Sequence, residues 1–406
     1  MCDVKKIEIT AYDYPLDEER IAKFPLAQRD TSKLLVLKNK KIETHVFHEI
    51  GTLLPSNSLL VCNETKVIQA RLQFRKNETS ALIELFCLEP FETDYQIVFG
   101  QGSPVVWKCL VGNSKKWKEG VLLLQIPLAD QIVELKAERL EKKETHSLIR
   151  FSWNPAKISF AALLEVAGKT PLPPYLHRES EQEDKERYQT VFARFDGSVA
   201  APTASLHLTE TLMCALQQQG HRFAFLTLHV GAGTFKPVAS QTIGDHEMHS
   251  ETIIVSKQSI ANLIETIGNP IIAIGTTSFR TLESLYWFGV MLGNEKNFSK
   301  PFHLDQWYPY QQQVSEISTE QALQNIVTYL EQTQQTKFVA STALMIVPGY
   351  RFKVATGIVT NFHQPKSTLL LLVSALIGEQ WKKVYDYALK NNFRFLSYGD
   401  SCLFIP

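Results

Sequence analysis

Five polar loops carry the residue types that proton transfer and anion binding require, and each adjoins an apolar run. They are VAAPTASLHLTE (199–210), LHVGAGTFKPV (228–238), DHEMHSE (245–251), GTTSFRTLES (275–284) and TNFHQPKST (360–368). Imidazoles exchange protons near neutral pH, while arginine, lysine and the free N–H groups of a helix start hold anions. Together the loops predict a pocket for a polar, partly charged small molecule.

Histidines in four of these loops are candidate general acids or bases. They are His207, His229, His249 and His363. Two of them could instead have a purely structural role. His207 also fits a packed residue beside a capping loop, and His229 also fits a hydrogen-bonded core histidine.

The loop 245–251 is tempting as a metal site, because it also holds Asp245, His246 and Glu251. His246 and His249 stand at i and i+3, however, and no third anchored ligand completes a zinc signature. We therefore predict no metal here, and a polar loop that contributes an acid or a base.

Gly231 and Gly233 allow a backbone to approach a ligand closely, or a turn with positive φ. The pair lacks the third glycine of a dinucleotide-binding fingerprint, so the motif alone is weak.

The loop 275–284 places Thr277, Ser278 and Arg280 at the N-terminus of a predicted helix. Free N–H groups and the helix dipole can hold a carboxylate or another anion there. An ordinary helix cap accounts for the same residues equally well.

The loop 360–368 also leads into a predicted helix. Pro365 and Ser367 suit its first turn and its cap. A capped helix start leaves Asn361, His363 and Lys366 unexplained, and these three residues favour a binding function.

The elements that must position these loops alternate between strand and helix from about residue 200 onward, which predicts an α/β domain with ligand-binding loops at its strand ends. Between residues 69 and 153, short β-rich runs separated by turns predict an inserted all-β, barrel-like domain. The α/β catalytic domain is then discontinuous, 1–68 and 154–406. Residues 286–336 are interpreted as an insertion within it, irregular at first and helical from 320 to 335.

Composition narrows the function classes. The chain has 406 residues with 42 Lys plus Arg and 42 Asp plus Glu, so no global field steers it toward nucleic acid or membranes. The longest apolar run, 369–378, is too short for a membrane span, the N-terminus is unlike a signal peptide, and the scattered cysteines form no CxxC pair. These features predict a cytoplasmic protein that does not act in a membrane.

Motifs along most of the chain resemble those of one family. FPLAQRDTSKLLVL, NETKVIQARL, TPLPPYLHR, ERYQTVFAR, PGYRFKV and FRFLSYGDSCL join the five loops, in family order, from about residue 12 to residue 404. The family is the S-adenosylmethionine:tRNA ribosyltransferase-isomerase of queuosine biosynthesis.

The resemblance implies a fold and a reaction. The fold is an α/β domain that carries an inserted β-barrel. S-adenosylmethionine is a consumed ribosyl donor, no further cofactor is needed, and the acceptor is 7-aminomethyl-7-deazaguanine at the wobble position of tRNA. The product is epoxyqueuosine, adenine and methionine leave, and the enzyme is expected to be a monomer.

The resemblance also implies site residues. The four histidines become acid and base candidates for the ribosyl transfer, and Arg280 is expected to hold the methionine carboxylate. The substrate-binding set is Thr203, Gly231, Gly233, Thr234, Thr277, Ser278, Arg280, Asn361, Lys366 and Ser367. The residues expected to meet tRNA phosphates are Arg178, Arg187 and Lys366.

Departures from the family pattern leave two alternatives open. Ser205 stands where a glycine is usual, and Ala340-Ser341-Thr342 stands where Gly-[Glu/Trp]-Thr is usual, so that Ala340 and Ser341 depart from the pattern. One alternative is a paralogue that uses S-adenosylmethionine on a free deazapurine or another nucleic acid. The other is a non-catalytic RNA-binding protein of the same fold.

Overall fold

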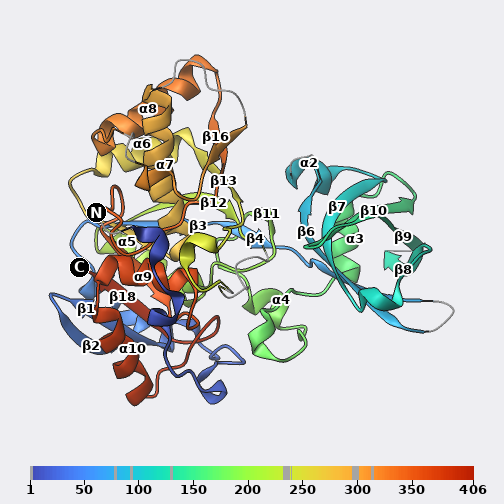
Figure 1. Cartoon of the computed structure of the whole chain (residues 1–406), viewed down its shortest axis with the longest axis horizontal. Helices are drawn as coiled ribbons and strands as arrows, with labels where there is room; N and C mark the ends of the chain where they lie inside the picture. The colour runs from blue at the N-terminus through green and yellow to red at the C-terminus, as the bar shows by residue number, and fades with distance from the viewer. Residues whose placement is uncertain are drawn as a thin grey trace.

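A large α/β body and a smaller barrel-like body make up the molecule (Figure 1). The computed structural model describes residues 3–76, 80–91, 95–128, 131–231, 238, 240–294, 301–311 and 315–406. One mixed sheet organises the large body, and a six-stranded antiparallel sheet forms the small one. The predicted fold class, an α/β domain with an inserted all-β domain, is confirmed.

The mixed sheet has ten strands in the order β15-β16-β13-β12-β3-β14-β17-β18-β1-β2. At its centre β12, β3, β14 and β17 run parallel to one another. The bounds are β1 Lys33–Lys38, β2 Lys41–Val46, β3 Leu59–Asn63, β12 Arg222–His229, β13 Glu251–Ser256, β14 Ile271–Ile274, β15 Phe302–Leu304, β16 Lys337–Thr342, β17 Gly357–Asn361 and β18 Ser401–Ile405.

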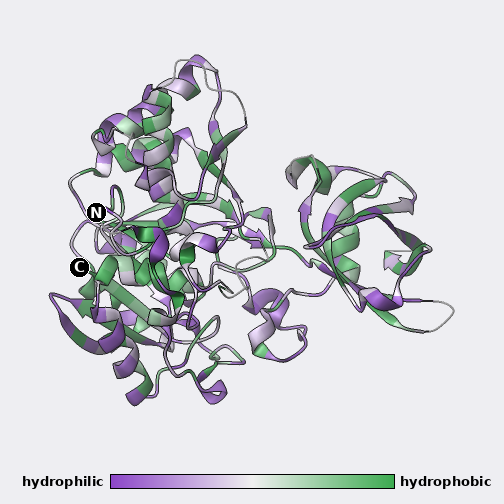
Figure 2. Cartoon of the chain, viewed as in Figure 1, coloured by the Kyte–Doolittle hydropathy of each residue, from purple (hydrophilic) through white to green (hydrophobic). Residues whose placement is uncertain are grey.

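The central strands are buried on both faces, which is why they read in the sequence as continuous apolar runs. In β3, Leu59 and Val61 point into one core, and Leu60 and Cys62 point into another. Helices α6 Lys257–Thr266, α7 Thr276–Asn294, α8 Thr319–Gln332, α9 Thr368–Ile377 and α10 Gln380–Lys390 contribute to the first core. Helices α1 Ile50–Leu53 and α5 Glu210–Gln218 contribute to the second. Figure 2 shows the hydrophobic colour gathered on the central strands and α9.

The smaller sheet pairs its strands in the order β5-β6-β7-β10-β9-β8. The bounds are β5 Arg71–Arg75, β6 Leu82–Pro90, β7 Val105–Gly112, β8 Leu122–Leu128, β9 Gln131–Lys142 and β10 Ser147–Asn154. β5 also lies against β8, so the sheet nearly closes on itself. Helix α2 is Tyr95–Gly100 and helix α3 is Phe160–Ala167.

Helix α3 contributes Phe160, Leu163 and Leu164 to the core of this barrel, and the Phe160 ring lies 5.6 Å from that of Trp107. We therefore propose to count α3 with the barrel. The domain boundaries predicted from the sequence, at residues 69 and 153, stay a prediction.

The segment predicted to be irregular from residue 287 is helical up to Asn294, so that part of the prediction is wrong. Residues 278–290 of α7 are all buried, so the apolar stretch 287–290 shows no amphipathic period of 3.6 residues. Gly289 permits the close approach of α8, since a Cβ there would lie 1.9 Å from the carbonyl oxygen of Ala322. The helix predicted within 320–335 is confirmed as α8.

Short elements complete the chain. A two-stranded sheet joins β4 Thr65–Val67 to β11 Phe195–Ser198, and α4 Asp184–Arg187 lies in the segment beside the connection to the barrel (Figure 1). The 3₁₀ helices are Val4–Lys6, Ile9–Tyr12, Glu18–Arg20, Arg29–Thr31, Phe47–Glu49, Ser114–Lys116, Pro174–Leu176, Thr203–His207, Ile243–Asp245 and Tyr308–Tyr310. In the described ranges, no helix combines the length and the apolar character that a membrane crossing requires.

Candidate active site

The polar loops meet at one edge of the large sheet. The parallel strands β3, β12, β14 and β17 all have their carboxyl ends there, and the antiparallel β13 begins there. A sheet of this kind binds ligands outside the carboxyl ends of its strands. The edge therefore brings together the loops 199–210, 245–251, 275–284 and 360–368.

Two adjoining hollows form a cleft at this edge. The larger spans about 740 Å³, part of it open to solvent, and is lined by residues that include Thr203, Asn361 and His363. The smaller spans about 480 Å³, also partly open, and is lined by residues that include His249 and Arg280. Thr276, Thr277 and Leu369 line both hollows, so the start of α7 stands where they join.

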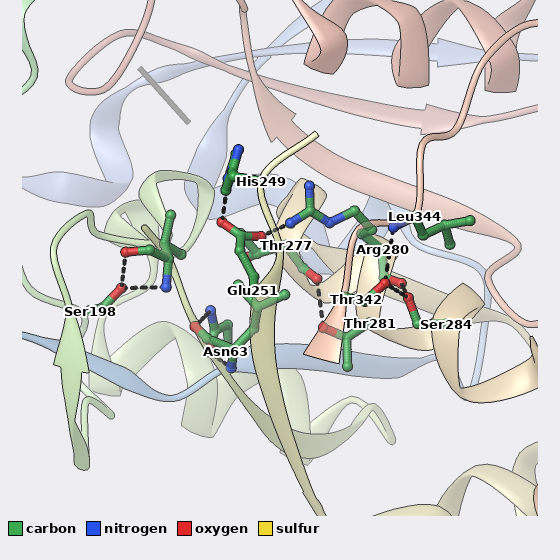
Figure 3. A network of polar contacts seen from close by, with 12 residues as sticks. Asn63, Ser198, His249, Glu251, Thr277, Arg280, Thr281, Ser284, Thr342 and Leu344 are labelled. Atoms are coloured by element: carbon green, nitrogen blue, oxygen red, sulfur yellow. Dashed lines mark hydrogen bonds and ion pairs between the residues drawn. The ribbon is translucent and has the colours of Figure 1, made fainter. Parts of the chain in front are cut away.

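Glu251, the first residue of β13, joins two predicted site residues (Figure 3). His249 Nε2 lies 3.1 Å from Glu251 Oε1, and the Arg280 guanidinium pairs with Glu251 Oε2. In the neutral imidazole, the carboxylate accepts from Nε2–H, which makes Nδ1 the basic nitrogen. The arrangement is a histidine oriented by a carboxylate, as in many general bases.

Arg280 and Glu251 are both buried, with side chains 9% and 1% exposed. Burial lowers the pKa of Arg280 to about 10, a value at which the guanidinium is still charged at neutral pH. Each charge therefore needs the other, because a lone charge in this environment is costly. The sequence predicted that Arg280 binds a substrate carboxylate. In the structure, the carboxylate of Glu251 already binds it.

His207 is buried between two hydrogen-bonding partners from distant parts of the sequence. Its Nε2 lies 3.1 Å from Asn361 Oδ1, and its Nδ1 lies 2.8 Å from Ser32 Oγ. Asn361 Nδ2 donates to the carbonyls of Leu396 and Ser397, so Oδ1 is the atom that accepts from His207. Burial lowers the pKa of His207, and the neutral ring fits this network. His207 thus holds Asn361 in place at the cleft wall, and both its nitrogens are occupied.

His363 lies on the wall of the larger hollow, directly after β17. Its Nε2 lies 2.9 Å from Thr360 Oγ1, its carbonyl accepts from the Tyr14 hydroxyl, and its backbone N–H donates to Tyr385 Oη at 3.1 Å. Burial lowers the pKa of His363 to about 3. The ring is therefore neutral at physiological pH and is a weak base.

His229 ends β12 and is buried. Its Nδ1 lies 3.1 Å from Thr65 Oγ1, and its ring lies 4.8 Å from that of Tyr95 in the barrel body. Gly197 makes room for the ring, since a Cβ at that position, where φ is +150°, would lie 2.6 Å from His229 Nδ1.

A further hollow lies between the two bodies of the molecule. His229, Gly231 and His249 line it from the large body, and Lys108 and His146 line it from the barrel. Gly231, a predicted substrate contact, is thus placed beside His249: a Cβ on Gly231 would lie 3.9 Å from His249 Cδ2. Gly233 and Thr234, also predicted, fall outside the described residues.

The start of α7 presents Thr277 to the cleft but not Ser278. Thr277 Oγ1 has no hydrogen-bond partner within the described part of the chain. Ser278 is fully buried and donates to the carbonyl of Ile274 at 3.0 Å, so its hydroxyl is used within the fold. Ser278 lines neither hollow, and we no longer assign it to the substrate.

The start of α9 behaves as the sequence predicted. Ser367 accepts from Leu370 N at 3.2 Å and so caps the helix, while it also lines the larger hollow. Lys366, in the left-handed region with φ of 54°, forms a half-exposed ion pair with Asp13 at 2.7 Å. Its charge is thus matched within the chain.

The two arginines predicted to meet tRNA differ in their partners. Arg178 makes a two-pronged ion pair with Asp184, at 2.7 and 2.8 Å, and its charge is matched. Arg187 instead donates to backbone carbonyls of residues 26–27 and has no carboxylate partner in the described ranges.

Sequence reasoning missed several wall residues. Glu251 was seen only as part of a candidate metal loop, although the alternating pattern ETIIVS already places its side chain inward, in phase with Ile253. Ser397 and Tyr175 also line the larger hollow, where the Tyr175 hydroxyl lies 2.6 Å from Ser397 Oγ. Nothing in the sequence around either residue indicates a place in a binding site. Among the described residues, no group of three or more His, Cys, Asp or Glu side chains is arranged to hold a metal ion.

Comparison with known proteins places the chain in a family. The chain matches the family model of queuosine biosynthesis proteins over residues 9–404. It is 34% identical over 404 residues to an S-adenosylmethionine:tRNA ribosyltransferase-isomerase of Sulfurihydrogenibium sp., covering 98% of this chain and 100% of that relative. A relative of the same name from Trichlorobacter lovleyi is 37% identical over 402 residues, covering 98% of this chain and 99% of the relative. The chain belongs to this family.

A solved relative is also similar to the chain. The crystal structure of S-adenosylmethionine tRNA ribosyltransferase from Thermotoga maritima is 30% identical, is matched over 97% of this chain and 99% of that one, and gives a TM-score of 0.46. The family predicted from the sequence motifs is confirmed by the family match and by the relatives.

The departures from the family motifs lie away from the cleft. Ser205 is fully buried and lines none of the hollows described above, so its hydroxymethyl group does not narrow them. Ala340 is buried on β16, and Ser341 lies on the same strand, where its Oγ is 2.8 Å from His303 Nδ1. The substitutions therefore change supporting contacts of the sheet rather than the walls of the cleft.

Proposed function

We propose that this queuosine biosynthesis family member transfers and isomerises the ribosyl moiety of S-adenosylmethionine onto 7-aminomethyl-7-deazaguanine at the tRNA wobble position. The product is epoxyqueuosine, with release of adenine and methionine. Family membership supports the reaction type. The observation that carries the assignment to this cleft is the buried Glu251, which orients His249 at the wall of the smaller hollow.

His249 is the proposed general base. A sulfonium acidifies the hydrogens on the adjacent C5′ carbon, so a positioned base can remove one of them and open the ribose with loss of adenine. The Glu251 carboxylate accepts from Nε2–H, stabilises the imidazolium that forms, and leaves proton transfer to Nδ1. The exocyclic amine of the acceptor base then attacks, and epoxide closure displaces methionine.

Arg280 and Thr277 are the proposed contacts of the methionine moiety. Arg280 lines the smaller hollow, and Glu251 uses only part of its five N–H donors. Thr277 offers a hydroxyl at the N-terminus of α7, where backbone N–H groups also favour an anion. A carboxylate that enters this hollow meets both.

The remaining wall residues serve as polar positioning groups. Asn361, held by His207, and the neutral His363 line the larger hollow beside Thr203 and Ser367. We assign them to recognition of the adenosine or of the deazaguanine, and we assign His207 a positioning role. His229 and Gly231, in the hollow between the two bodies, are proposed to complete the far wall. The monomeric state and the cytoplasmic location stay predictions.

An incubation with S-adenosylmethionine and tRNA bearing the aminomethyl-deazaguanine tests the proposal. We expect adenine release only with that tRNA, together with the epoxide nucleoside. Release with the free base would instead support the paralogue, and tRNA binding without release would support the non-catalytic RNA-binding protein. His249→Ala is expected to lose about 10²–10⁴-fold of the rate, the usual contribution of a general base. His45→Ala, on the edge strand β2, is the matched control and is expected to keep the full rate.

A further inference from the structure

A hollow with three arginines lies beside the cleft. Arg29, Arg187 and Arg394 line it, together with His207 and Ser397. Ser397 also lines the larger hollow of the cleft, and His207 bonds Asn361 in the cleft wall. The arginine hollow and the proposed substrate cleft therefore share a wall.

Backbone carbonyls hold two of the guanidinium groups in place. Arg29 donates to the carbonyls of Gln189 at 2.5 Å and Glu186 at 2.9 Å. Arg187 donates in return to the carbonyls of Leu26 and Ala27. Leu26 also lines the hollow. These four hydrogen bonds join residues 26–29 to residues 186–189. They orient both guanidinium planes without neutralising either charge.

Two of the three arginines in the hollow, Arg29 and Arg187, lack an ion-pair partner among the described residues. Within the described residues, neither Arg29 nor Arg187 has a carboxylate within ion-pair distance, whereas Arg178 nearby pairs with Asp184 and Arg394 lies 3.4 Å from Asp400. Burial, and then the charge of Arg187, lower the pKa of Arg29. Arg187 Nε is buried with no hydrogen-bond partner in the described ranges. Two like charges brought together in a half-buried hollow favour an anion from outside.

We propose that Arg29 and Arg187, with Arg394 beside them, bind a backbone phosphate of tRNA that flanks the nucleotide held in the cleft. This inference rests on the proposed function. S-adenosylmethionine carries a carboxylate but no phosphate, whereas a polynucleotide brings a phosphate on each side of the modified base. Arginine is suited to phosphate because its planar fork donates two parallel bonds. Because Ser397 lines both hollows, a phosphate bound here would lie beside the nucleotide held in the cleft.

The test is the salt dependence of tRNA binding by the full chain. For single-stranded RNA, each phosphate contact contributes about 0.7 to the slope of log K against log salt. We expect Arg29→Gln and Arg187→Gln each to make this negative slope shallower by about 0.7, and the double variant to make it shallower by about 1.4. Across a fourfold rise in salt, the double variant should thus lose about sevenfold less affinity than the wild type.

Three controls separate the outcomes. Arg351→Gln removes an exposed guanidinium that lines none of these hollows and should keep the wild-type slope. Affinity for S-adenosylmethionine alone should stay unchanged in all variants. Arg29→Lys and Arg187→Lys, which keep the charge, should keep most of the slope. They also serve as the test if the glutamine variants fail to fold, because a Lys variant that lost the slope despite native folding would contradict a charge-based site.

Different results would refute the phosphate site and the proposed function. If the wild type releases adenine but the double variant keeps the wild-type slope, the phosphate site is refuted and the function stands. If the wild type neither binds this tRNA nor releases adenine, both are refuted.

Discussion

The buried pair of Arg280 and Glu251 can be tested by removing its partners one at a time and together. Glu251→Gln keeps the size and a hydrogen-bonding group but leaves the guanidinium buried without a counter-charge. Arg280→Met keeps the packing volume but leaves the carboxylate, which still accepts from His249. The double variant removes both charges, so the three variants form a double-mutant cycle.

The structure sets the expected magnitudes. Both side chains are less than a tenth exposed, so loss of one partner should cost about 3–5 kcal/mol of unfolding free energy, the range for broken buried pairs. We place Glu251→Gln at the upper end of this range and Arg280→Met at the lower end, at about 3 kcal/mol, because His249 still donates to the remaining carboxylate. The double variant should cost about 1–2 kcal/mol, since neutral residues of similar volume replace buried ions with little loss.

Urea unfolding of the four proteins measures these differences, with the transition of the α/β body fitted separately from that of the barrel. Glu331→Gln is the matched control, because it breaks an exposed pair with Lys257 at 2.7 Å and should cost less than about 0.5 kcal/mol. A Glu251→Gln cost no larger than that control, or strictly additive single costs, would refute the reasoning.

Three further predictions concern other buried groups. Because the folded-state pKa of His363, about 3, lies below its unfolded value, the folded protein binds this proton less, and stability falls as pH drops below about 6.5. About 1.4 kcal/mol should be lost at pH 5.5, and His363→Gln should remove that part of the pH slope in thermal melts, where an unchanged slope would argue against it. Glu283→Ala leaves a tyrosine hydroxyl and three backbone N–H groups without their acceptor, so urea unfolding should show a cost of about 4 kcal/mol or more, and a cost near 1 would contradict it. Gly197→Ala should displace the His229 ring, and we expect a lower rate of adenine release with S-adenosylmethionine affinity kept; an unchanged rate would count against a wall position for His229.

Local signals predicted the elements of the fold well. Ser367 was identified as a helix cap from its neighbours, and its side chain accepts from the backbone N–H of Leu370, as a cap should. The helix predicted from 320 to 335 is α8, Thr319–Gln332, with an apolar face that is buried. These features depend on residues within a few positions of one another, which is why one sequence suffices for them.

Contacts between distant residues could not be predicted in the same way. Ser32 and His207 are 175 positions apart, and nothing in either loop indicates that the hydroxyl occupies the imidazole. Ser278 was assigned to the substrate because it stands at a helix start, but helical geometry turns its hydroxyl back to the carbonyl of Ile274. Side-chain direction within the first turn separates it from Thr277, which does reach the cleft.

The cleft at the carboxyl ends of β14 and β17 is the centre of this account, and filling it tests the account most directly. Thr203→Trp places an indole in the larger hollow, whereas Thr333→Trp adds the same group at the exposed end of α8. Adenine release from S-adenosylmethionine with the deazaguanine-bearing tRNA should fall to background in the first variant and stay at the wild-type rate in the second. A Thr203→Trp protein that melts like the wild type and still releases adenine at the wild-type rate would contradict the placement of the reaction in this cleft.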